Sequence, residues 1–130
     1  MKRTVINPSG VHKPVSHYSH AVKVGDLVWI TGQIAIDKDG NVVGKGDCVA
    51  QTHQVYQNLR DVLNGVGSGM DKIVKLNTYV VNVEDVEKIR GIKSQYIEKD
   101  PPASTLVVVK ALAYPDLLLE MEAVAAVAGK

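Results

Sequence analysis

The segment LLLEMEAVAAV at positions 117–127 is the longest apolar stretch of the chain and constrains its fold most strongly. Every second side chain from Leu119 onward is apolar and suits contact with a layer of helices. The positions between them mix two carboxylates, Glu120 and Glu122, with small apolar groups. This alternation predicts a β-strand with one face on a hydrophobic core and the other in a mixed environment.

The first third of the chain is predicted to be rich in strands. The segment HAVKVGDLVWITGQI at 20–34 contains two apolar runs that meet at Gly25 and Asp26, which indicates a hairpin. The segment IDKDGNVV adds a second turn of this kind at Asp39 and Gly40.

Two amphipathic helices are expected further along. The first follows an N-cap at Asp47 and ends at Gly65 and Gly67, where its pattern of apolar residues stops. The second is capped by Asn82 and carries carboxylates in its first turn, where they interact favourably with the helix dipole. Each helix has one apolar stripe, so both can pack against a sheet.

Further strands are expected at 71–81, between the helices, and at about 105–110 and 117–127 after them. Two helices can cover only one face of such a sheet. We therefore predict an α/β (α+β) fold, with a mixed sheet and two helices on one face. Residues 1–130 should form a single domain, because this length supports one hydrophobic core.

The face without helices is predicted to carry Ile73, Tyr79, Val108 and Val124. A surface this apolar does not remain in contact with water. We therefore expect a homo-oligomer in which these faces pack together, with any site shared between subunits.

Composition excludes several classes of partner. The chain has 15 Lys and Arg against 14 Asp and Glu, without a basic stripe, so we do not expect nucleic acid as a partner. The four histidines lack the spacing of a metal site and Cys48 is the single cysteine, so we expect no metal site. Cys48 itself is expected to be a buried thiol. No apolar run approaches the roughly 20 residues of a membrane span, and the first residues lack the apolar core of a signal peptide. We therefore expect a cytoplasmic protein without a membrane partner.

Glu122 is the most informative acid, because a carboxylate in an apolar strand must be paired, hydrogen-bonded or active with a raised pKa. A structural ion pair is the alternative interpretation for Glu122. Tyr18 is the second candidate, and simple aromatic packing is its alternative.

Four segments together resemble the RidA family, also called YjgF, of small enamine and imine deaminases. They are HYSHAV, ITGQIAID, PPASTLVVV and LLLEMEAVAAV, and the match extends over essentially the whole chain. The resemblance implies a chorismate-mutase-like fold, a homotrimer with three clefts between subunits, a small-molecule substrate, and neither a metal nor an organic cofactor.

The resemblance also implies a reaction and its residues. In the deaminases, water adds to the C=N bond of a short-lived 2-imino acid and yields a 2-oxo acid and ammonia. By motif position, Glu122 matches the catalytic glutamate and Tyr18 the early tyrosine. Thr31 and Gly32 match the hairpin residues beside the cleft.

Ser104 occupies the position at which the deaminases have an arginine that binds the substrate carboxylate, and Thr105 and Leu106 follow it. A serine donates one uncharged hydrogen bond, whereas arginine forms a bidentate, charge-assisted pair. Two hypotheses follow. The protein is a RidA-like deaminase or hydrolase whose substrate carboxylate is absent or held otherwise, or it is a non-catalytic trimeric module that binds a metabolite or another protein.

Overall fold

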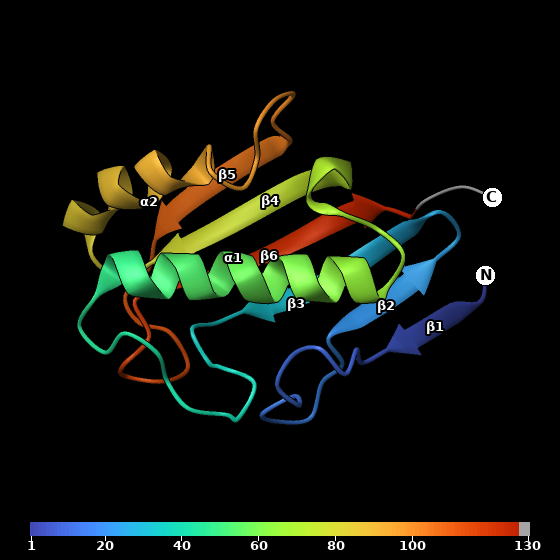
Figure 1. Ribbon diagram of the computed structural model, residues 1–130, viewed down its shortest axis with the longest axis horizontal. Coiled ribbons are helices and arrows are strands. Elements are labelled where there is room, and N and C mark those ends of the chain that lie inside the picture. The colour runs from blue at the N-terminus through green and yellow to red at the C-terminus, as the bar shows by residue number, and fades with distance from the viewer. Residues whose placement is uncertain (128–130) are drawn as a thin grey trace.

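Six strands form one mixed sheet in the computed structural model, which describes residues 1–127. Their order across the sheet is β1-β2-β3-β6-β4-β5, and only β4 and β5 are parallel neighbours. The strands are β1 (Arg3–Ile6), β2 (Ala21–Val24), β3 (Leu27–Gln33), β4 (Ile73–Val80), β5 (Ala103–Val108) and β6 (Leu119–Ala126) (Figure 1).

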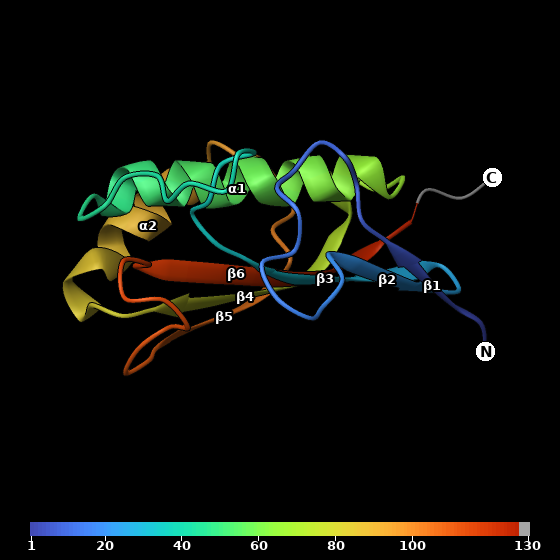
Figure 2. The ribbon, with the colours of Figure 1, turned by 90° about the horizontal axis from the view of Figure 1, so that it is seen from below.

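Both α-helices, α1 (Cys48–Gly65) and α2 (Val86–Lys93), lie on the same face of the sheet, as Figure 2 shows. Short 3-10 helices precede β4 (η1, Met70–Lys72) and α2 (η2, Val83–Asp85). The predicted fold class is therefore confirmed. Neither helix of the described chain is long and apolar enough to cross a membrane.

Local signals account for several element boundaries. Gly25 has a φ of 59° in the turn that joins β2 to β3, a conformation that glycine adopts without steric cost. Asp47 caps α1, because its carboxylate accepts a hydrogen bond of 3.1 Å from the Ala50 amide. The helix ends at Gly65, and Gly67 follows with a φ of 81°.

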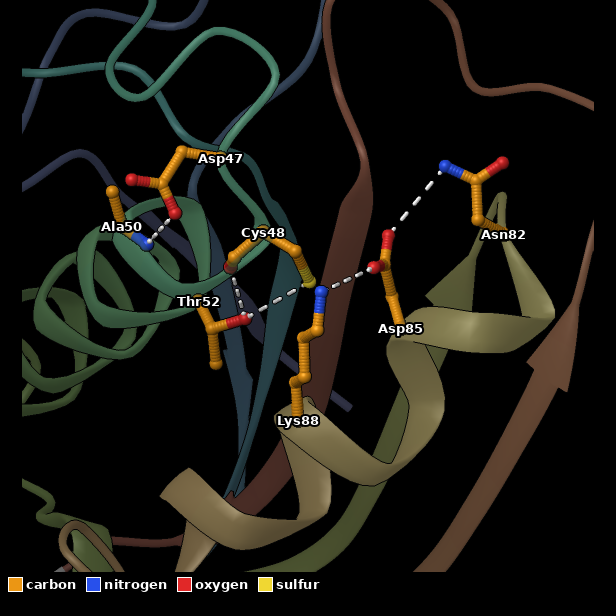
Figure 3. A network of polar contacts seen from close by, with 7 residues as sticks. All are labelled: Asp47, Cys48, Ala50, Thr52, Asn82, Asp85 and Lys88. Atoms are coloured by element: carbon orange, nitrogen blue, oxygen red, sulfur yellow. Dashed lines mark hydrogen bonds and ion pairs between the residues drawn. The ribbon is translucent and has the colours of Figure 1, made fainter.

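The start of α2 differs from the prediction. Asn82 does not cap the helix, because η2 intervenes and α2 begins only at Val86. The Asn82 amide instead donates to the buried Asp85 carboxylate over 3.5 Å, and Lys88 approaches that carboxylate from α2, as Figure 3 shows. Cys48, at the start of α1, lies close to Asp85 and Lys88 in the same figure. Burial raises the pKa of the Cys48 thiol, in agreement with the buried thiol expected there.

The helix-covered face contains the hydrophobic core. In β6 it receives the predicted alternate positions, and all of them are almost fully buried: Leu119, Met121, Ala123 and Ala125. β4 adds Leu76 and Val80, which are 1% and 0% exposed. Alternation of side chains along each strand therefore places every second residue of β6 on the opposite face, as predicted.

Two of the four residues predicted for the uncovered face are on the other side. A register shift between Ile73 and Lys75 turns Ile73 toward the helices, where it pairs with Ala125 and is 8% exposed. Val108 pairs with the buried Val80 and so shares its side of the sheet, because paired residues point to the same face. Tyr79 and Val124 lie on the uncovered face as predicted.

Large apolar side chains are exposed on the uncovered face of β1, β3 and β5. Val5, Leu27 and Trp29 are 46%, 38% and 47% exposed, and Val107 of β5 is 41% exposed. No helix of the described chain lies on this side (Figure 2). Large apolar side chains therefore stay exposed on this face of the subunit.

Candidate functional site

Three residues predicted for the site, Tyr18, Thr31 and Gly32, line one cavity of about 240 Å³. The cavity lies where β3 ends and β6 begins. Glu120, Tyr114 and Ser16 also line it, so the cavity has one carboxyl group and four hydroxyl-bearing neighbours: Ser16, Tyr18, Thr31 and Tyr114. Such a combination of an apolar hollow with a few polar groups is typical of a small-molecule site.

The end of β3 shapes this cavity. The pairing of β3 with β6 shifts register between Ile30 and Gln33, and Gly32 lies within the shift. A Cβ atom at Gly32 would overlap Oε2 of Glu120 and would lie 2.7 Å from its Cδ. A side chain at position 32 would displace the Glu120 carboxyl group, because that group lies across the backbone of β3.

The environment of Glu120 favours its protonated form. Burial raises the pKa of Glu120, and the negative charge of Glu122 adds to the effect. A carboxyl group with a raised pKa can both accept and return a proton closer to neutral pH. Glu120 is thus the acid of this cavity that is suited to proton transfer.

The structure places Glu122 outside the cavity. Its carboxylate accepts hydrogen bonds from the Tyr79 hydroxyl over 2.7 Å and from the Asn77 amide over 3.2 Å. The hydrogen bond to Glu122 is the main cause of a raised Tyr79 pKa, because it favours the protonated phenol. The acid predicted from the motif is therefore a hydrogen-bonded group of the uncovered face, and Glu120 is the acid that meets Tyr18 and Gly32.

Sequence reasoning did not identify the polar support behind the cavity. The Gln33 amide donates to the Thr31 carbonyl over 3.2 Å and to Nδ1 of His20 over 3.3 Å. Nε2 of His20 donates to the His12 carbonyl over 2.7 Å, which leaves Nδ1 as the acceptor in a neutral ring. Burial lowers the pKa of His20, in keeping with this neutral form. Only the three-dimensional structure shows that these residues meet, since their spacing follows no known motif.

A second cavity, of about 140 Å³, contains Ser104 and Leu106 and lies between α2 and β5. Lys93 of α2 donates a hydrogen bond of 3.3 Å from Nζ to Oγ of Ser104, and Arg90 also lines the cavity. The sequence suggested an uncharged position at Ser104. The structure instead places a cation beside it, because one turn of α2 passes over the start of β5.

Thr105 lies on the opposite side of β5 from Ser104 and Leu106, because successive side chains of a strand alternate. Its hydroxyl accepts a hydrogen bond of 2.8 Å from Nζ of Lys75. The two cavities share no lining residue. Within one subunit, the predicted site residues are therefore divided between two cavities, and Thr105 and Glu122 line neither of them. No cluster of three or more metal-ligating side chains occurs among residues 1–127.

Comparison with known proteins identifies the family. The family model described as Endoribonuclease L-PSP matches residues 10–127. The chain belongs to this family, the RidA/YjgF family. A RutC family protein of Pyrococcus abyssi is 35% identical over 125 residues, which are 96% of this chain and 98% of the relative. Protein HMF1 of Saccharomyces cerevisiae is 34% identical over 109 residues, or 84% and 83% of the two chains.

Solved structures of the RidA/YjgF family agree with the fold. The yeast protein YEO7 superposes with a TM-score of 0.93 at 30% identity, covering 98% of this chain and 100% of that one. RidA from an Antarctic Psychrobacter gives a TM-score of 0.89 at 26% identity, with 95% and 99% coverage. These likenesses extend over the whole sheet and both helices.

Proposed function

We propose that this RidA-family protein is a hydrolase of C=N bonds, an imine or enamine deaminase that acts as a homotrimer. The observation that carries the proposal is the carboxyl group of Glu120, which has a raised pKa and lies in a cavity with Tyr18 and Thr31. The single, buried cysteine, Cys48, suits a cytoplasmic protein.

The proposed reaction uses Glu120 as the group that moves protons. The Glu120 carboxylate accepts a proton from water as the water oxygen bonds to the imine carbon, and Glu120 passes this proton to the imine nitrogen as the C=N double bond becomes a single bond. In the resulting carbinolamine, the carboxylate accepts the hydroxyl proton and returns it to the nitrogen, so ammonia leaves as the C–N bond breaks and the C=O bond forms. The motif predicted Glu122 for this role. The first experiment therefore compares the turnover of variants at Glu120 and Glu122.

The substrate carboxylate is proposed to bind at Lys93 and Ser104. The two side chains are already 3.3 Å apart, and Arg90 lines the same cavity. A lysine supplies a point charge and lacks the planar, two-point geometry of arginine. We therefore expect weaker carboxylate binding than an arginine would give, but not its complete loss. A structure of the same fold, Escherichia coli TdcF, contains bound serine, so the fold accommodates a ligand of amino-acid size.

Assembly would join the two cavities. In the proposed homotrimer, the Ser104 cavity of one subunit faces the Glu120 cavity of its neighbour. The apolar, uncovered face that carries Trp29 and Leu27 supports such an assembly, since 47% and 38% of these side chains are exposed in the single subunit.

The decisive experiment measures ammonia release from 2-iminobutyrate generated in situ by a threonine dehydratase. Glu120→Gln should reduce turnover by about 10²–10⁴-fold, because the amide keeps the shape but cannot transfer the proton. Glu122→Gln, the matched substitution two residues away, should reduce it by less than about tenfold. The opposite ranking would assign the proton transfer to Glu122.

The carboxylate contact has its own test. Lys93→Gln should raise KM, whereas Lys38→Gln, on an exposed loop, should leave it unchanged. Ser104→Arg should raise kcat/KM if the guanidinium fits beside Lys93. Absence of turnover in the wild type and in all variants would favour the alternative, a trimeric binding module. Single-stranded RNA is included as a substrate because of the family's description, and with a net charge of +1 we expect no cleavage.

A further inference from the structure

A cavity of about 450 Å³ lies on the helix-covered side of the sheet and shares no lining residue with the two cavities of the candidate site. Its walls come from the second half of α1, from η1 and from the connection 94–102 between α2 and β5. Because β4 and β5 are parallel neighbours, the segments that lead into them lie at the same end of the sheet (Figure 1). The cavity is therefore separate from the uncovered face that the proposed trimer would bury.

Arg60 of α1 lines this cavity and is held in place by an aromatic ring. Its guanidinium group lies over Tyr96, 5.7 Å from the ring centroid. Tyr96 is itself fixed, because its ring stacks on Tyr56 with the centroids 4.5 Å apart, and a hydrogen bond of 2.6 Å links its hydroxyl to Nδ1 of His53. Contact with a ring face orients a guanidinium group and leaves its N–H donors available. Arg60 is thus positioned to bind a carboxylate.

The lining of the cavity carries both signs of charge. Asp71 is paired with Lys72 of the same short helix, over 3.8 Å. The other four charged side chains of the lining form no ion pair within residues 1–127: Arg60, Lys99, Glu98 and Asp100. Two cations and two carboxylates in one hollow are complementary to a small ligand that carries one positive and one negative group.

The backbone is unusual at one of these carboxylates. Asp100 is the one residue other than glycine with a positive φ, 49°, among residues 1–127. It also precedes Pro101, and the residue before a proline normally adopts an extended conformation. Unfavourable backbone conformations of this kind concentrate at binding sites. The connection therefore retains such a conformation at a residue whose carboxylate lines the cavity.

The remainder of the lining is largely apolar. Ile73 and Ile97 are 8% and 9% exposed, and Met70 and Pro102 lie beside them in the same cavity. The register shift that turns Ile73 toward the helices also brings it here. A ligand with an apolar group would cover these side chains, and the volume suits a small molecule.

We propose that this cavity binds a free α-amino acid with an uncharged, apolar side chain. The α-carboxylate pairs with Arg60, the α-ammonium group pairs with Glu98 and Asp100, and the side chain lies on Ile73 and Ile97. Both ionic groups of the ligand contribute, because charge-assisted hydrogen bonds are stronger than neutral ones. The inference assigns a second binding site and does not depend on the proposed deaminase function.

The first measurement compares ligands that differ in one charge. The full-length protein is titrated calorimetrically with leucine, with leucinamide, which lacks the carboxylate, and with N-acetyl-leucine, which lacks the ammonium group. Leucine should bind at least about tenfold more tightly than either derivative, since a hydrogen bond to a charged group contributes about tenfold or more. Glycine should also bind more weakly than leucine, because it leaves Ile73 and Ile97 uncovered.

The second measurement assigns each ionic group to its partner. Arg60→Gln should weaken leucine binding at least about tenfold and leave leucinamide unchanged, since leucinamide has no carboxylate to lose a partner. Arg3→Gln, at an exposed arginine of β1 outside the cavity, is the matched control and should change neither.

Asp100→Asn removes the charge and keeps a residue type that tolerates a positive φ. It should weaken leucine binding and leave N-acetyl-leucine unchanged. Asp61→Asn, at an exposed position of α1 outside the cavity, should have no effect on either ligand.

Further variants distinguish this cavity from the candidate site. Glu120→Gln and Lys93→Gln should both retain wild-type affinity for leucine. Loss of affinity in these two variants, with unchanged affinity in Arg60→Gln, would place the ligand at the candidate site and overturn the inference. Equal affinity for leucine and its two derivatives, or no binding of leucine at millimolar concentration, would overturn it as well. Ammonia release from imines tests the deaminase function separately, so either proposal can fail alone.

Discussion

The two faces of the sheet differ in what completes them. On the helix-covered face, Leu76 and Leu119 are 1% and 0% exposed, because the chain supplies its own covering layer. On the other face, Trp29 and Val107 remain 47% and 41% exposed next to the hydrogen-bonded Glu122. One face thus stabilises the subunit, and the other leaves apolar side chains exposed and carries Glu120, the acid of the candidate site.

The largest effect is expected on assembly from Trp29→Glu. In the proposed trimer, a carboxylate at this position would lose its hydration without gaining a partner, which opposes association. Sedimentation at micromolar concentration should show a trimer for the wild type and monomers for the variant. Trp29→Leu, which keeps an apolar side chain, should remain trimeric. A monomeric wild type would reject the assembly and the shared cleft.

The next largest effect is expected on the stability of the subunit, from a substitution on the helix-covered face. Leu76→Ala should lower the free energy of unfolding by about 2–5 kcal/mol, because it leaves a cavity in the core. Urea unfolding in the Trp29→Glu background removes the contribution of assembly. In that background Val107→Ala, on the uncovered face, should lower the free energy of unfolding by less than about 0.5 kcal/mol. Equal costs for the two substitutions would contradict the distinction between the faces.

A smaller effect is expected from pH, through the network behind Thr31. The pKa of His20 lies below its ordinary 6.5 in the folded protein, so the unfolded chain binds the proton first as pH falls. The free energy of unfolding should therefore decrease as pH drops below 6.5. Glu120 acts with the opposite sign, because its raised pKa contributes stability that is lost as pH rises above 4.5.

The two contributions can be separated by working in the Glu120→Gln background. There, urea unfolding between pH 7 and pH 5 should show the His20 dependence, and His20→Asn should abolish it. His17→Asn, at an exposed histidine, serves as the control. A pH dependence that persists after His20→Asn would exclude His20 as its source.

The smallest effect is expected from Tyr79→Phe on the uncovered face. The change removes the 2.7 Å hydrogen bond to Glu122, while Asn77 still donates to the same carboxylate. We expect a loss of about 0.5–1.5 kcal/mol in urea unfolding and nearly unchanged imine turnover. A large loss of turnover would instead indicate that the Glu122 cluster takes part in the reaction.

Local patterns were sufficient for most elements of this fold. The Gly25 turn, the Asp47 cap and the apolar stripe of α1 depend on neighbours within a few residues, and all were predicted. The start of α2 was not, because the 3-10 helix η2 (Val83–Asp85) lies between Asn82 and the first residue of α2. The faces of Ile73 and Val108 were also misassigned, because one register shift reverses the side to which a strand residue points.

By itself the sequence determined that the chain forms a mixed sheet with helices on one face, because side-chain alternation and helix caps are local properties. It also determined that both glutamates of β6 lie on the uncovered face. Only the tertiary structure decided that Glu120 meets the candidate cavity. With a side-chain period of two, Glu120 and Glu122 are equivalent along the strand, and the register of β6 against the irregular end of β3 places Glu120 alone beside Gly32.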